Sequence, residues 1–298
     1  MELSPKTGDS AGRGNPQANV VPLTSELIEQ IARSAVKTHI NNRLHEEVMD
    51  AGISPTQFQA GTFPDSYQSR ITICHDGVDT DAIVANPNAS LALPNGKTVT
   101  KRDEVITFIN RNLEPYRGYH RFMRALPELL RRRLDADIVL LGGDETSYGA
   151  RPPDGKTWKQ IFIDEVRGQI PDADWARVHF MGRVPYDTFL SMIQVSTVHV
   201  YLTYPFVLSW SLFETMSVTG AVVASNTAPV KEAITHGQNG RLVDFFDKDA
   251  LVEEVSRLLE SAEERETLGQ AARKLIVDRY DLERICLPRQ LKWVQSLV

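Results

Sequence analysis

The chain has 298 residues, a formal net charge of −6 and 24% charged side chains, which is the composition of a globular protein. Its negative charge does not favour binding to nucleic acid, and no apolar run approaches the roughly 20 residues that a membrane-spanning helix needs. The two cysteines, Cys74 and Cys286, form neither a disulfide framework nor a metal-binding pattern, so we expect reduced thiols and no metal site.

The first hundred or so residues show few regular patterns. Residues 1–22 are rich in Gly, Ser, Pro, Asn and charge, so we predict a disordered tail; they include no apolar signal segment, which favours a cytoplasmic location. Leu23–Ala51 carries a rough apolar stripe at helical spacing and is predicted to be a helix. Arg70–Cys74 alternates like a strand, and Asn86–Thr100, with its Asn, Pro and Gly residues, is interpreted as a linker.

From Val105 onward, short β-branched runs alternate with amphipathic segments. Strands are expected at Val105–Ile109, Ile138–Leu141, Val178–Met181, Thr197–Leu202, Ala221–Ala224 and Gly240–Val243. Helices are expected at Tyr119–Leu130, Trp158–Val166, Phe189–Val195, Pro229–Thr235, Ala250–Leu259, Leu268–Val277 and Leu282–Leu297. This alternation predicts an α/β fold with a Rossmann-like, doubly wound parallel sheet.

The stretch Val195–Ser225 is predicted to be a strand–loop–helix–strand unit, whose loop opens at the carboxyl end of a strand, where parallel sheets bind ligands. A helix that begins near Ser209, Trp210 and Ser211 offers backbone N–H groups and a positive dipole end, so we interpret it as a diphosphate site. Glu214, one turn further, could reach an attached sugar or ribose. The alternative is a capping box, because Ser211 and Glu214 have the S-x-x-E spacing; both interpretations stay open.

Other candidate site residues lie at the ends of predicted strands. Arg111 and Arg117 follow the first strand of the sheet, and the pattern favours an anion contact because a guanidinium group binds phosphate oxygens. Gly143, at the end of another strand, would let a ligand approach the backbone, with a plain turn as the alternative. Glu232 could face a ligand or only water.

Four motifs occur in a fixed order: Asn110–Gly118, Gly182-Arg183-Val184, Tyr204–Ser217 and Thr227–Gly240. Because of these motifs, the chain resembles the carboxy-terminal, nucleotide-sugar-binding domain of the retaining glycosyltransferases of group 1 (family four), which have the GT-B fold. The resemblance runs from about Ser54 to the end of the chain. The resemblance implies that Glu214 binds the donor ribose, that the backbone at Ser209-Trp210 meets the diphosphate, and that Arg111 and Arg117 neutralise it. Glu232 falls where the family has a Glu in a Gly-x-Pro-Glu-like turn.

The chain also departs from the family pattern. The family has a pair of glutamates spaced E-x7-E, and Phe206 stands at the position of the first one, which usually contacts the donor sugar. Much of the amino-terminal acceptor domain is expected to be absent, which predicts an uncovered apolar face on Leu27–Val48 and near Phe58 and Phe63. The expected division is a remnant of that domain at 23–85, a linker at 86–104, the donor domain at 105–280 and a final helix at 281–298.

Two functions follow from the resemblance. The first is metal-independent, cofactor-free transfer of a sugar, with retention, from a nucleotide sugar to a saccharide, lipid or protein acceptor. The second is a catalytically impaired nucleotide-sugar-binding or regulatory subunit. Another GT-B enzyme, such as an epimerase or a phosphorylase, ranks third. A separate chain that supplies the amino-terminal domain and peripheral attachment to a membrane are further expectations left open.

Overall fold

The computed structural model describes residues 49–297. The predicted tail 1–22, most of the predicted helix Leu23–Ala51 and the apolar stripe Leu27–Val48 therefore lie outside the described residues. The last three positions of that predicted helix, Met49–Ala51, are described and are not helical.

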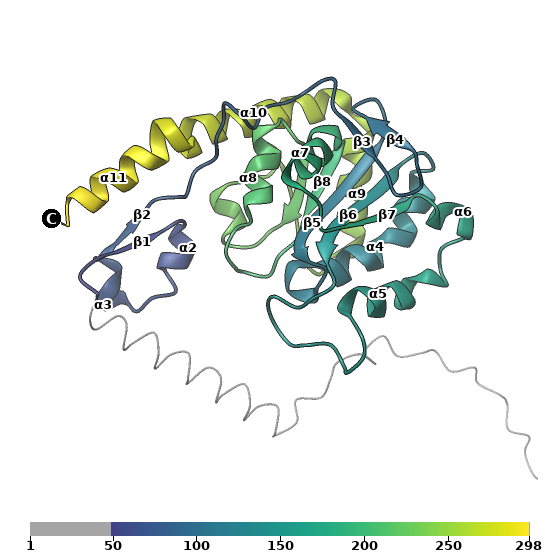
Figure 1. Cartoon of the computed structure of the whole chain (residues 1–298), viewed down its shortest axis with the longest axis horizontal. Coiled ribbons are helices and arrows are strands. Elements are labelled where there is room, and N and C mark those ends of the chain that lie inside the picture. Colours follow the sequence, from purple (N-terminus) through teal and green to yellow (C-terminus); the bar gives the residue numbers. More distant parts are fainter. Residues whose placement is uncertain (1–48, 298) are drawn as a thin grey trace, which may run out of the picture. The chain divides into compact units, whose positions relative to one another are not determined.

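A parallel sheet of six strands, in the order β10-β9-β8-β5-β6-β7, forms the centre of the unit that begins at Ala51 (Figure 1). Its strands are β5 (Val105–Asn112), β6 (Asp137–Gly143), β7 (Val178–Gly182), β8 (Val198–Tyr201), β9 (Val222–Ser225) and β10 (Arg241–Val243). All six strands predicted from Val105 onward are present, and every pairing is parallel. The chain runs outward from β5 to β7 and then returns to the other side of β5 with β8, so the switch point of the sheet lies between β5 and β8.

Helices cover both faces of this sheet. They are η1 (Pro115–Arg117), α4 (Tyr119–Arg132), α5 (Trp158–Arg167), α6 (Asp172–Trp175), α7 (Tyr186–Val195), α8 (Trp210–Ser217), η2 (Val230–Glu232), α9 (Lys248–Glu260) and α10 (Ala262–Tyr280). Alternate residues of β5 enter two separate cores: Ile106 and Phe108 pack with α4, α5 and α9, and Val105 and Ile109 pack with α7, α8 and α10. The predicted doubly wound arrangement is confirmed. The predicted helix Pro229–Thr235 is only the short turn η2.

The segment interpreted as a linker contains a β-hairpin. Its strands β3 (Ser90–Ala92) and β4 (Thr98–Thr100) are antiparallel, and Leu91, Leu93 and Val99 are buried in the core on the α7 side of the sheet. Gly96, with φ of +87°, completes the turn between the strands. The linker interpretation was wrong in this respect, because it took Pro, Asn and Gly as signs of a connection and missed the alternating apolar residues beside them.

The described residues before the hairpin form two short strands and two short helices. Strands β1 (Gly52–Ser54) and β2 (Ile71–Ile73) pair in parallel, and α2 (Gln57–Ala60) and α3 (Asp65–Gln68) connect them. Ile53 and Ile73 are each 39% exposed, whereas Phe58 and Phe63, near which an uncovered apolar face was expected, are half-buried.

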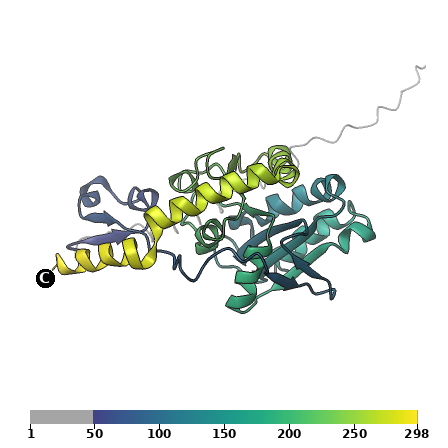
Figure 2. The ribbon, with the colours of Figure 1, turned by 90° about the horizontal axis from the view of Figure 1, so that it is seen from above.

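The chain ends in a bent helical segment. After α10, a π-helical turn η3 (Leu282–Cys286) leads into α11 (Leu287–Gln295), so the predicted single helix Leu282–Leu297 consists of two parts (Figure 2). None of the helices in the described part of the chain is both long and apolar enough to span a membrane.

Candidate functional site

A cleft of about 590 Å³ opens at the carboxyl ends of β5, β6 and β7, on one side of the switch point of the sheet. Its walls come from the three strand ends and the loops that follow them. The lining residues are Asn110, Arg111, Asn112, Leu141, Glu145, Thr146, Ser147, Arg183 and Val184. This volume lies within the roughly 300–1,000 Å³ of small-molecule sites, at the sheet edge where the sequence predicted a ligand.

The loop after β6 is held against the cleft by a buried carboxylate. Glu114 is fully buried, and its oxygens accept hydrogen bonds from the backbone N–H groups of Ser147 and Tyr148 at 3.0–3.2 Å. Burial raises the pKa of Glu114, while these N–H groups and the nearby Arg117 guanidinium act to lower it. In the same wall, the Asn112 side-chain amide donates to the Ser147 hydroxyl at 2.6 Å. The cleft therefore has a preorganised wall.

Gly143 is explained by crowding at this wall. A Cβ at this position would lie 2.5 Å from Asn112 Oδ1 and 2.8 Å from Arg183 Nε. The glycine thus makes room for two side chains that line the cleft. A direct approach of ligand to its backbone stays a prediction.

The cleft carries positive charge. The Arg111 side chain is exposed at its rim, and Arg183, also exposed, pairs with Glu145 at 2.5 Å. The lining of the cleft thus holds two guanidinium groups and one carboxylate. Because exposed ion pairs are weak, Arg183 can exchange its carboxylate partner for another anion at little cost.

Arg117 does not line this cleft. Its guanidinium is buried and donates to the carbonyl oxygen of Val207 at 2.8 Å, with the Tyr201 and Thr203 hydroxyls at 3.3 Å. The ring of Phe206 lies 4.8 Å from it. The structure thus brings Arg117 to the loop that precedes α8, where it contacts protein groups, whereas Arg111 lies in the cleft. The predicted pairing of the two arginines around one diphosphate remains untested.

The amino terminus of α8 lies where it was predicted. Ser209 is the N-cap; its hydroxyl accepts from the Ser211 N–H at 3.4 Å, and its own N–H donates to the Tyr201 hydroxyl at 2.9 Å. Trp210 is 64% exposed, and its indole N–H donates to Asp76 at 3.2 Å.

Glu214 is not part of a capping box. Because the cap is Ser209, the pair Ser211 and Glu214 does not have the capping register, and Glu214 instead accepts a hydrogen bond from the Tyr186 hydroxyl at 2.8 Å. Burial raises the pKa of Glu214, and the Tyr186 bond opposes this effect. Neither Tyr186 nor Glu214 is among the residues that line the cleft, although Tyr186 follows Val184 of its wall by two positions in the sequence.

Glu232 lies in another part of the unit. Its two carboxylate oxygens accept from the backbone N–H groups of Gln57 at 2.8 Å and Phe58 at 2.5 Å, in the first turn of α2. It therefore serves as a cap for a helix 174 or more residues away in sequence. Glu232 is not among the residues that line the cleft, so its predicted contact with a ligand stays a prediction.

Sequence reasoning gave no role to Asn112, Glu114 or Ser147, and quoted Arg183 only within a motif. Asn112 and Glu114 lie within the motif Asn110–Gly118, so their position at the end of a predicted strand could have marked them as candidate site residues. Their partners come from the loop after β6, and no pattern within either segment indicates that pairing.

Comparison with known proteins places the chain in a family. Residues 94–275 match the family described as "Glycosyl transferases group 1", and residues 22–83 match "Glycosyl transferase family 4 group". The GDP-mannose-dependent alpha-(1-6)-phosphatidylinositol monomannoside mannosyltransferase of Mycolicibacterium smegmatis is 28% identical over 68% of this chain and 51% of its own length. Spore coat protein SA of Bacillus subtilis is 24% identical over 61% of this chain and 46% of its own length. The chain spans about half the length of the curated relatives it matches.

Solved structures share the fold. HepE from Anabaena in complex with UDP and glucose has a TM-score of 0.67 at 17% identity, over 86% of this chain and 65% of that chain. Sucrose-phosphate synthase from Thermosynechococcus elongatus has a TM-score of 0.64 at 18% identity, over 85% of this chain and 59% of that chain. These likenesses confirm the predicted α/β fold of GT-B type. Together with the family match over residues 94–275, they lead to one conclusion: the chain belongs to the group 1 glycosyltransferases.

Proposed function

We propose that the chain binds a nucleoside-diphosphate sugar in the cleft at the ends of β5, β6 and β7 and transfers its sugar with retention of configuration. The observation that carries this proposal is the positive, preorganised cleft beside the switch point of the sheet, lined by Arg111 and Arg183. Family membership supports it, as does the fact that relatives are named for GDP-mannose and for complexes with UDP.

In this proposal the guanidinium groups stabilise the leaving group. As the bond between sugar and diphosphate breaks, negative charge builds on the diphosphate and positive charge on the sugar. Arg111 and Arg183 lie where they can bind phosphate oxygens, and each such charged hydrogen bond contributes on the order of 1–3 kcal/mol. The Glu214 carboxylate would accept from ribose hydroxyls, and the Tyr186 hydroxyl holds it in place. Arg117 would act indirectly, because it fixes the loop that leads into α8.

Calorimetry with UDP, GDP and ADP tests the donor site. We expect saturable binding of at least one nucleotide, weakened about tenfold or more in Arg111→Gln and in Arg183→Gln. The matched control is Arg102→Gln, an exposed arginine that precedes the amino end of β5, at the opposite edge of the sheet. Absence of saturable binding in a folded sample, or equal loss in the control, would reject the site.

The stereochemical claim needs a separate measurement. Slow hydrolysis of the bound donor can be followed by proton NMR, which distinguishes the two anomers of the released sugar before they equilibrate. We expect the anomer of the donor first; the opposite anomer would contradict retention.

One observation favours a second candidate, donor binding without turnover. The ring of Phe206 lies over the Arg117 guanidinium at 4.8 Å, and Tyr116 and Tyr148 pack against the same ring at 5.0 and 4.8 Å. The side chain of Phe206 has no group that can form a hydrogen bond to a sugar. The chain would be a nucleotide-sugar-binding or regulatory subunit if it binds a nucleotide sugar, if this binding is weakened in Arg111→Gln and Arg183→Gln, and if the bound sugar is not hydrolysed.

A further inference from the structure

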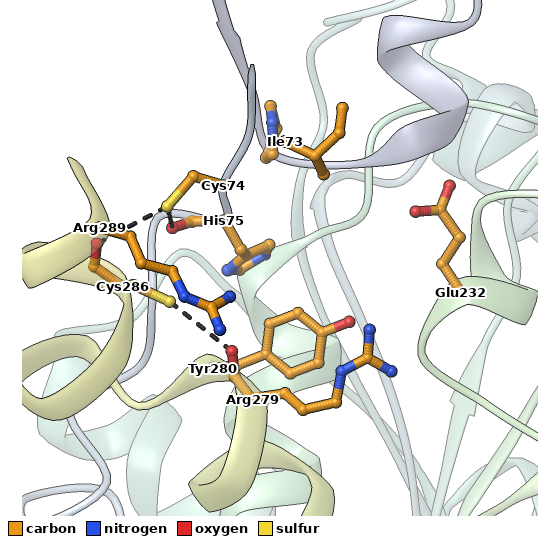
Figure 3. A pocket seen from close by; sticks show the side chains of 9 residues that line it. Ile73, Cys74, His75, Glu232, Arg279, Tyr280, Cys286 and Arg289 are labelled. Carbon is orange, nitrogen blue, oxygen red and sulfur yellow. Dashed lines mark hydrogen bonds between the residues drawn. The ribbon is translucent and has the colours of Figure 1, made fainter. Parts of the chain in front are cut away.

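A second cavity, of about 240 Å³, lies apart from the donor cleft and shares no lining residue with it. Its walls come from the end of β2, the η2 turn, the end of α10 and the start of α11 (Figure 3). Arg279, Arg289, His75 and Tyr280 are among the residues that line it.

The bend between α10 and α11 builds this cavity. The Val78 N–H donates a hydrogen bond to the Tyr280 carbonyl, and the Leu282 N–H donates one to the Val78 carbonyl, both at 2.8 Å. These two bonds hold the bend against the segment after β2. The buried Asp281 accepts from the Thr80 hydroxyl and, at 2.8 Å, from Arg284. The π-helical turn that follows shifts the helical register, so Arg279 before the bend and Arg289 after it line the same space.

The two arginines of this cavity have no anionic partner in the described part of the chain. Neither guanidinium group takes part in an ion pair or a hydrogen bond there, whereas Arg284, on the same bend, is paired with Asp81 and Asp281. The Arg279 guanidinium lies 5.7 Å from the centre of the Tyr280 ring. Figure 3 shows both arginine side chains extending alongside this ring, one from each helix.

His75 adds a directed donor. The ring is buried, 4.3 Å from the Phe213 ring and 5.2 Å from the Tyr280 ring, so its orientation is set by packing. Nδ1 accepts a hydrogen bond from the Gly77 N–H at 3.0 Å, which leaves the proton of the neutral ring on Nε2. The only carboxylate in the lining is that of Glu232, and its oxygens are already engaged by two N–H groups of α2.

We propose that this cavity binds the phosphate group of a small soluble phosphomonoester. Two unpaired guanidinium groups and an imidazole N–H match the oxygens of such an anion. The volume is several times the ~30 Å³ of one water molecule, so it leaves room for an organic substituent against Ile73 and Tyr280.

The two cysteines provide a reporter of this cavity. Cys74 and Cys286 are the only cysteines of the chain, and both line it. Burial raises the pKa of both thiols, so alkylation by N-ethylmaleimide should be slow and its protection measurable.

The experiment uses the full chain with glycerol 3-phosphate, and with glycerol plus sodium chloride at equal ionic strength as the control. We expect saturable heat in calorimetry and at least threefold slower alkylation of both thiols with glycerol 3-phosphate alone. Both effects should be lost in Arg279→Gln/Arg289→Gln, tested also as single variants, and retained in Arg111→Gln and Arg102→Gln.

Three results would overturn the proposal. They are unchanged binding in the double variant, loss of binding in Arg111→Gln, and binding to phosphatidic acid vesicles without binding to glycerol 3-phosphate. Because the cavity variants leave the cleft residues unchanged, a failure here is distinguishable from a failure of nucleotide binding.

Discussion

At the scale of single residues, Glu114 carries the clearest stability consequence. Glu114→Ala would leave the Ser147 and Tyr148 N–H groups without their acceptor in a buried position, which we expect to cost about 2 kcal/mol or more in the free energy of unfolding. Urea denaturation measures this cost. The matched control is Glu145→Ala in the same loop, whose exposed pair with Arg183 should contribute less than about 1 kcal/mol. Equal effects of the two variants would contradict the role given to Glu114.

His120 predicts a pH dependence of stability. Its ring is 8% exposed among Phe162, Tyr204 and Phe245, and burial, helped by Arg124 and Arg121, lowers its pKa to about 4. In the unfolded chain the pKa of this histidine is about 6.5. Between about pH 6.5 and pH 4 the unfolded chain therefore binds a proton at His120 that the folded chain does not bind. Stability should therefore fall as the pH drops from about 6.5 to 4, by up to about 1.4 kcal/mol per pH unit from this residue.

The variant His120→Phe isolates that contribution. Urea unfolding at pH 7.5, 6 and 5 should show a shallower loss of stability for the variant than for the natural chain. His199, whose pKa burial lowers to about 3, adds the same slope to both proteins and cancels in the difference. Parallel curves would show that His120 does not titrate as inferred.

At the scale of elements, the end of β6 links packing to the cleft. In Gly143→Ala the new methyl group would displace the Asn112 and Arg183 side chains, and Asn112 would lose its bond to Ser147. Because the displaced atoms are ends of side chains, we expect a stability loss of only about 1 kcal/mol but nucleotide affinity reduced about tenfold. Gly168→Ala, at a helix end with nothing within 4 Å of its Cβ position, is the control and should be neutral or slightly stabilising. Calorimetry and urea denaturation of both variants decide the matter, and unimpaired nucleotide binding by Gly143→Ala would contradict it.

The contact between η2 and α2 is a second feature at this scale. Glu232→Ala should lower the hydrogen-exchange protection of the Gln57 and Phe58 amides by about tenfold, because each loses its acceptor. The effect should stay local, since α2 has four residues. Lys231→Ala, an exposed neighbour, is the control in exchange mass spectrometry. Unchanged protection in Glu232→Ala would mean that the cap does not persist in solution.

At the scale of the whole molecule, the cleft joins three strands of one sheet. A ligand held there should therefore stabilise the whole unit against unfolding. At a nucleotide concentration of about 100 times Kd the gain should be about 2.7 kcal/mol. Urea unfolding followed by circular dichroism measures it, with Arg111→Gln at the same nucleotide concentration as the control. A stabilisation equal in both proteins would place the nucleotide elsewhere.

The sequence by itself determined the six strands of the large parallel sheet, most of the helices that cover it and the edge at which the candidate site opens. Buried parallel strands are short β-branched runs, and parallel strands with helical crossovers all end at the same edge, so local pattern was sufficient. The start of α8 was likewise readable, because the capping preference of Ser209 acts within two residues.

Only the tertiary structure decided which strand-end residues meet. Arg111 and Arg117 are six positions apart and equally basic, yet one lines the cleft and the other is buried against Val207. Glu114, Glu214 and Glu232 likewise take partners 28 to 175 residues away. The reason is physical: burial and hydrogen-bond partners depend on the order of strands in the sheet and on the path of the loops between them, and these arise from contacts between distant segments that no local pattern encodes.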